Sequence, residues 1–99
     1  MSSRRIANLR DRLIAIRPER RRIVTELVFA CRDCEFSGDV RQRAAERLDE
    51  ITENSGVRFG VVEVLAIIRL VIAIWRWVDD QGWLETATPK FIEDTLGVN

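Results

Sequence analysis

The stretch GVVEVLAIIRLVIAIWRWVDD, residues 60–80, decides the fold of this chain because it is the longest apolar run in the sequence. Many of its residues are β-branched, which by intrinsic preference favours a strand. Its length favours a helix, since about twenty residues without a turn signal far exceed an ordinary strand of about five or six. Glu63 near its start and Arg76 near its end also complement a helix dipole. We therefore predict one long helix over about 60–80.

A helix of this length is also nearly long enough to cross a membrane. Residues 61–78 would extend roughly 27 Å at about 1.5 Å per residue, against a bilayer core of about 30 Å. Arg69 at the centre opposes insertion, whereas Trp75, Trp77 and Trp83 at one end are typical of an aromatic belt at the membrane interface. A membrane-associated protein anchored by 61–78 is therefore one alternative.

The angular distribution of the side chains favours a different environment for this helix. At 100° per residue, small and charged residues fall within one strip of the helix surface. A mostly buried bundle helix shows such a strip where it meets solvent. We therefore favour the central helix of a soluble bundle over a membrane span. The strip comprises Arg58, Val62, Ala66, Arg69, Ala73, Arg76 and Asp80.

The N-terminal third has the apolar spacing of an amphipathic helix. Apolar residues recur there at intervals of three and four, with one interruption, which is a heptad pattern. Pro18 interrupts it and either kinks one helix or begins a second one. The apolar positions are Ile6, Leu9, Leu13, Ile16, Ile23, Leu27, Ala30 and Cys34.

Two further helices are predicted from their start and stop signals. Asp39 is a candidate N-cap for a short charged helix that ends near Gly56. After a stop at Gly82, a short helix begins behind Thr88 and ends before Gly97. We therefore predict a single all-α domain over 1–99, a small helical bundle. Four main helices and a short C-terminal helix pack around the hydrophobic helix at about 60–80.

Charge is unevenly distributed along a chain whose net charge is zero. Residues 1–22 carry a net charge of +6 and residues 48–99 a net charge of −5. The halves could attract each other, or the first could bind a polyanion such as nucleic acid. The candidate contacts for nucleic acid or an acidic partner are Arg4, Arg5, Arg10, Arg12, Arg17, Arg20, Arg21 and Arg22.

The residues give little support for catalysis, a metal site or a cofactor. The chain has no histidine and no tyrosine, and Cys31 and Cys34 are its only cysteines. Two thiolates are too few for a structural zinc site, and this pair lies on the apolar positions of a helix, so we expect core cysteines. We expect the carboxylates of Glu46, Asp49, Glu50 and Glu53 to form solvated ion pairs with Arg43 and Arg47. We therefore predict a non-enzymatic protein without cofactor or metal.

The remaining hypothesis is that the protein acts through contacts with other proteins. The apolar heptad positions could be buried within the monomer or form part of an interface, and clustered tryptophans can anchor an interface. We expect Trp77 and Trp83 to be freer to be exposed than Trp75. No N-terminal signal peptide is visible, so we expect a cytoplasmic protein. Protein–protein interaction or self-association is the favoured function, with nucleic-acid binding and membrane anchoring as alternatives. The candidate interface residues are Trp77, Trp83, Leu9, Leu13 and Ile16.

Overall fold

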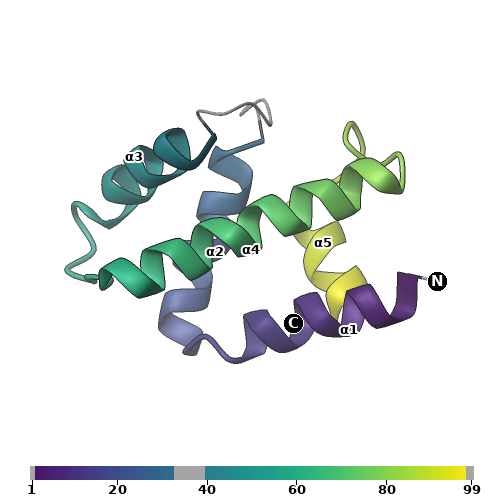
Figure 1. Ribbon diagram of the computed structural model, residues 1–99, viewed down its shortest axis with the longest axis horizontal. Helices are drawn as coiled ribbons and strands as arrows, with labels where there is room; N and C mark the ends of the chain where they lie inside the picture. Colours follow the sequence, from purple (N-terminus) through teal and green to yellow (C-terminus); the bar gives the residue numbers. More distant parts are fainter. Residues whose placement is uncertain (1, 33–39, 98–99) are drawn as a thin grey trace.

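The computed structural model describes residues 2–32 and 40–97, and every regular element within them is a helix (Figure 1). This confirms the predicted all-α class and the bundle of four main helices with a short fifth one. The candidate N-cap Asp39 and Cys34 lie outside the described residues. The helices are α1 (Ser2–Ile14), α2 (Pro18–Ala30), α3 (Val40–Thr52), α4 (Val61–Asp80) and α5 (Pro89–Leu96).

Pro18 separates two helices and does not kink one. The residue before it has φ −57° and ψ 142°, outside the helical region, as expected from the clash of a proline ring with the preceding residue. Pro18 is then the first residue of α2. Arg21 closes the turn, because its guanidinium donates hydrogen bonds of 3.0–3.1 Å to backbone oxygens at the end of α1. These are the oxygens of Leu13, Ile14 and Ile16.

The other helix ends follow the signals read from the sequence. Thr88 caps α5, since its hydroxyl oxygen accepts a hydrogen bond of 3.1 Å from the backbone N–H of Phe91. Gly97 ends α5 with a φ of 73°, a left-handed conformation that glycine adopts without penalty. At the start of α4, the Glu63 carboxylate accepts a hydrogen bond of 3.3 Å from the backbone N–H of Gly60.

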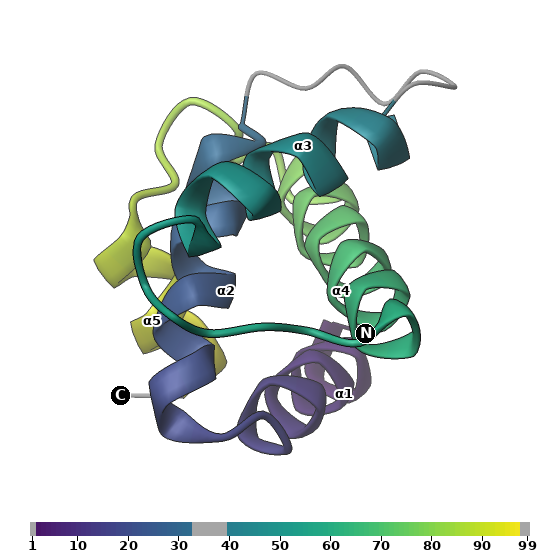
Figure 2. The ribbon, with the colours of Figure 1, turned by 90° about the vertical axis from the view of Figure 1, so that its left-hand side faces the viewer.

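The long helix α4 lies at the centre of the packing, with α1, α2 and α3 all in contact with it. Viewed from the end where α4 begins, α1 and α3 lie on two sides of α4 and α2 lies across from it (Figure 2). Trp75 of α4 ties it to α2, because its indole N–H donates a hydrogen bond of 2.7 Å to the backbone oxygen of Val28. The buried side chains of α4 are Ile67, Ile68, Leu70, Val71, Ile74, Trp75, Trp77 and Val78.

The strip of small and charged residues on the central helix lies at the surface, as predicted. Six of its seven members are exposed and Ala73 is half-buried. No helix in the described part of the chain is long and apolar enough to cross a membrane. Eight of the twenty residues of α4 are buried in the bundle.

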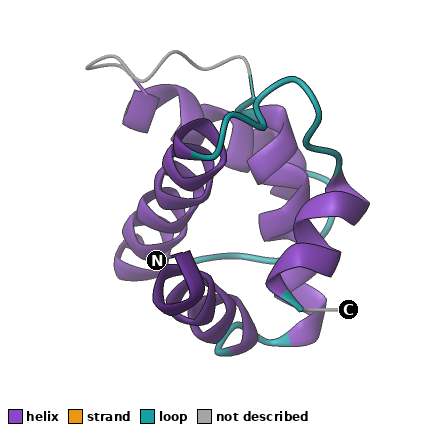
Figure 3. Cartoon of the chain, turned by 90° about the vertical axis from the view of Figure 1, so that its right-hand side faces the viewer, coloured by secondary structure: helices purple, strands orange, loops and turns teal. Residues whose placement is uncertain are grey.

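The prediction that Trp77 is free to be exposed is wrong. Its side chain is 0% exposed because the segment after α4 folds back over it. In that segment Trp83 packs edge-to-face on Trp77, with ring centroids 5.6 Å apart. Phe91 of α5 packs in the same way on Trp83, at 5.1 Å. Figure 3 shows the loop that brings α5 back beside the bundle. The tryptophans therefore close one end of the core and do not form an aromatic belt.

Candidate functional site

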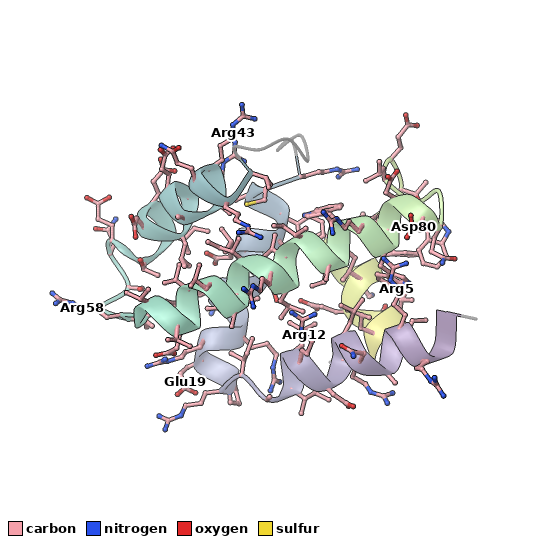
Figure 4. The ribbon with its side chains drawn as sticks, viewed as in Figure 1. Arg5, Arg12, Glu19, Arg43, Arg58 and Asp80 are labelled. Atoms are coloured by element: carbon pink, nitrogen blue, oxygen red, sulfur yellow. The ribbon has the colours of Figure 1, made fainter. Side chains whose placement is uncertain are left out.

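Two neighbouring hollows lie where α1 runs beside α4. The larger has a volume of about 660 Å³ and lies between the α1–α2 turn and the N-terminal half of α4. The smaller, of about 420 Å³, lies further toward the start of α1. Arg12 lines both hollows and extends from α1 toward α4 (Figure 4). We call the two together the α1–α4 crevice.

The crevice combines an apolar floor with a basic rim. In the larger hollow, apolar side chains come from the α1–α2 turn, from the segment before α4 and from α4 itself. They are Ala15, Ile16, Phe59, Ala66, Ile67 and Leu70. Arginines also line this hollow, and the only carboxylate among its lining residues is that of Glu63. The arginines that line the two hollows are Arg4, Arg5, Arg12, Arg17 and Arg20.

The exposed strip of α4 borders this crevice and carries two further arginines outside it. Ala66 lines the larger hollow and Ala73 the smaller, so this strip borders α1. Arg69 and Arg76 each follow one of these alanines by three residues, and both are exposed. Residues three apart on a helix are surface neighbours. Arg69 and Arg76 therefore lie beside these alanines on the exposed face of α4, and neither lines a hollow.

Carboxylates neutralise only part of this positive charge. Asp80 at the end of α4 forms an ion pair of 2.6 Å with Arg5 (Figure 4). Glu63 forms an ion pair with Arg20, whose guanidinium also lies 5.1 Å from the ring centroid of Phe59. The other three arginines that line the hollows, and the two on the exposed face of α4, form no ion pair with any described residue: Arg4, Arg12 and Arg17, and Arg69 and Arg76.

The eight N-terminal arginines predicted as contacts therefore divide into groups. Five of them line the crevice. Arg21 does not, because its side chain is engaged with the backbone at the end of α1. Arg10 lies 4.0 Å from its neighbour Asp11, and Arg22 is exposed on α2; neither lines the crevice. The sequence showed the cluster, but the direction of the turn at Pro18 decides which members face α4.

Three of the five candidate interface residues are inaccessible in this structure. Leu9 and Leu13 are 3% and 4% exposed and belong to the core, as does Trp77. Leu9 and Leu13 therefore follow the alternative in which the heptad positions are buried within the monomer, because α1 packs this apolar face against the rest of the bundle. Ile16 is half-buried and lines the larger hollow, and Trp83 is half-buried against Phe91.

The predicted ion pairs along α3 are absent from the structure. Among the described residues, none of the carboxylates of Glu46, Asp49, Glu50 and Glu53 pairs with an arginine. All four are exposed, and Glu46 accepts a hydrogen bond from Gln42. Cys31 is 2% exposed in the core, as expected of a structural cysteine. The described residues contain no group of three potential metal ligands.

Sequence reasoning missed part of one exposed apolar group. Val61, Val62 and Leu65 in the first turns of α4 are 79%, 80% and 47% exposed. The predicted strip includes Val62, whereas Val61 and Leu65 were not among the residues expected at the surface. A detectable signal was the length of α4, which exceeds by seven residues each of the 13-residue helices α1, α2 and α3 that pack on it.

No protein-family model, curated protein or solved structure matches this chain.

Proposed function

We propose that this protein is a non-enzymatic helical module that binds an acidic, amphipathic segment of a partner protein in the α1–α4 crevice. The observation that carries the proposal is the combination of an apolar floor with a rim of arginines. Three of the five arginines that line the two hollows have no carboxylate partner among the described residues. An amphipathic helix with apolar residues on one face and carboxylates beside them would satisfy both features.

The two features have different roles in such a complex. Exposed ion pairs contribute only about 0–1 kcal/mol each, so the arginines chiefly steer the partner and select its charge. Affinity comes from apolar burial on the floor, formed by residues such as Ile16, Phe59 and Leu70. Guanidinium forks bind carboxylates in a planar, bidentate manner, which suits a partner with acidic side chains.

The apolar floor favours a protein segment over nucleic acid. A phosphate backbone is bound mainly through charge, and bases need aromatic platforms or groove-reading side chains. Phe59 is the only aromatic side chain that lines the described hollows of the crevice, and Arg20 lies over its ring. The crevice therefore offers charge for phosphates but no free stacking surface for bases.

A peptide titration tests the proposal. The probe is a fluorescently labelled model helix with leucines at positions i, i+3, i+4 and i+7 and glutamates elsewhere. We expect a Kd of about 1 μM, near −8 kcal/mol, at about 50 mM salt. A scrambled peptide of the same composition, which cannot form an apolar face, serves as the ligand control.

Matched variants locate the binding site. Arg12→Glu with Arg17→Glu reverses two arginines of the crevice and should weaken binding at least about tenfold. Arg22→Glu with Arg41→Glu makes the same change in net charge at exposed positions outside the crevice and should leave binding nearly unchanged. Absence of binding to the helical peptide, or equal losses in the two variants, would refute the proposal. Tighter binding to single-stranded or duplex DNA than to the peptide would favour the nucleic-acid alternative.

A further inference from the structure

The first turns of α4 carry an apolar patch that the monomer leaves uncovered. Val61, Val62 and Leu65 are three of the five large apolar residues that the described chain exposes, and they lie within five consecutive positions. Single exposed apolar residues are ordinary, whereas contiguous ones mark interaction surfaces. We call these three residues the α4 patch.

Unpaired carboxylates lie at the same end of the molecule as the α4 patch. The C-terminal half of α3 and the loop after it expose Asp49, Glu50 and Glu53, none of which forms an ion pair with a described residue. A short connection leads from the end of α3 to the start of α4, so both lie at one end of the bundle (Figure 1). This end therefore presents apolar and acidic groups together, which is the chemistry expected of an occupant of the α1–α4 crevice.

The α4 patch and the larger hollow both lie along the N-terminal half of α4. Ala66, Ile67 and Leu70 line the larger hollow, directly after the patch in sequence. When complementary surfaces are this close, a two-fold axis near them can place each patch in the other copy's crevice. The result is a closed dimer, since both complementary surfaces of each copy are then used.

We propose that the occupant of the α1–α4 crevice is a second copy of this chain, in a two-fold dimer with two reciprocal contacts. In each contact the α4 patch of one copy covers the apolar floor of the other. The carboxylates at the end of α3 then face the arginines of that copy's crevice. This inference rests on the function proposed above, because it assigns the partner of the same crevice.

The two reciprocal contacts would share the area that a stable dimer requires. A stable interface covers about 800 Å² per partner, roughly an eighth of the 6509 Å² surface of this chain. In a two-fold dimer each copy contributes both its patch and its crevice, so each contact needs to cover only half of that area. Charge complementarity also makes the association dependent on salt, because exposed charges are screened at high ionic strength.

Sedimentation velocity of the full chain over a range of concentrations, at about 50 mM and about 500 mM salt, tests the proposal. We expect a dimer at the lower salt and weaker association at the higher. Val61→Ser with Val62→Ser removes apolar contacts, Arg12→Glu with Arg17→Glu reverses the crevice, and Glu50→Arg with Glu53→Arg reverses the carboxylates. Each pair should weaken the dimer at least about tenfold. Arg22→Glu with Arg41→Glu should not.

The decisive measurement combines the two charge reversals in one chain. If carboxylates and crevice face each other across the dimer, a protein with both reversals regains most of the affinity that each reversal loses. Circular dichroism verifies that every variant stays folded; the substituted residues are exposed. A wild-type monomer at all concentrations, a dimer insensitive to both reversals, or a combined variant no better than the single reversals would each overturn the proposal. Binding of the monomer to anionic phospholipid vesicles through the α4 patch would also overturn it.

The outcomes separate this inference from the proposed function. If the protein is a monomer that binds the acidic model helix in its crevice, the proposed function stands and the dimer proposal is refuted. A dimer of the proposed form should be dissociated by that same peptide, because both occupy one crevice. A dimer that the peptide does not affect would place the interface elsewhere and refute the inference.

Discussion

Trp75 and Trp77 form a natural matched pair for measuring a buried hydrogen bond. They lie two residues apart on α4 and are 1% and 0% exposed. The indole N–H of Trp75 donates to the backbone oxygen of Val28 at 2.7 Å, whereas that of Trp77 has no hydrogen-bond partner within the described residues. Val28 lies in the last turn of α2, where helix carbonyls lack an intrahelical partner. Trp75 therefore satisfies a buried group at a helix end.

Replacing each tryptophan by phenylalanine removes similar apolar volume but changes hydrogen bonding in opposite ways. The loss of about three ring atoms costs ~2 kcal/mol in either variant, at about 0.8 kcal/mol per buried carbon. Trp75→Phe also leaves the Val28 oxygen without its partner, which adds about 1–3 kcal/mol. Trp77→Phe removes a buried N–H that lacks a hydrogen-bond partner. This change offsets the loss from the smaller ring by about 1–3 kcal/mol of unfolding free energy. We expect a total cost of ~3–5 kcal/mol for Trp75→Phe and close to zero for Trp77→Phe.

Urea unfolding followed by far-UV circular dichroism measures both free energies of unfolding without relying on tryptophan fluorescence. A single domain of this size usually unfolds in two states, which permits the comparison. The stability of such a domain is about 5–15 kcal/mol, so Trp75→Phe removes a large part of it. If the two variants lose the same free energy within ~0.5 kcal/mol, the indole–carbonyl hydrogen bond does not have the assigned role.

Two smaller effects on stability follow from the helix ends. Arg21→Ala should lower the free energy of unfolding by about 2 kcal/mol, because three backbone oxygens lose a guanidinium donor that is only part-exposed. Arg21→Lys should recover less than half of that loss, since a lysine ammonium lacks the planar set of donors that reaches all three oxygens. Full recovery of the free energy of unfolding in urea would contradict this geometry. Thr88→Ala should cost about 1 kcal/mol by removing the cap of α5, and Thr88→Ser should cost much less. A thermal unfolding midpoint that is equal in both Thr88 variants would show that the hydroxyl does not cap the helix.

Local signals in the sequence predicted the helices well because each depends on residues close to it. Pro89 and Gly97 bracket α5 as expected, since proline fits the first turn and glycine the left-handed end. The strip on α4 was also predicted, because exposure on a buried helix follows from a period of 3.6 residues. Pro18 was compatible with either a kink or a break. The three hydrogen bonds of Arg21 stabilise the break, and nothing in the local sequence specifies them.

The candidate site was predicted less well because it depends on how the helices meet. The basic cluster was recognised, yet Arg21 is structural, and the apolar floor comes partly from Ala66, Ile67 and Leu70 in a distant segment. Trp77 was expected at the surface because the sequence of α4 does not show that residues 81–97 fold back over it. The carboxylates of α3 were expected to pair within their own helix, and the structure leaves them without arginine partners.

By itself, the sequence determined the all-α class and the water-facing strip of the central helix. Those properties follow from hydrophobic periodicity and from caps, which act over a few residues. Only the tertiary structure decided that the strip borders a crevice, that arginines from α1 and α2 share it, and that Val61 and Leu65 stay uncovered. The physical reason is that a crevice is the space between surfaces. Its shape and charge depend on the direction in which α1 leaves α2 and on how far α4 extends beyond its neighbours.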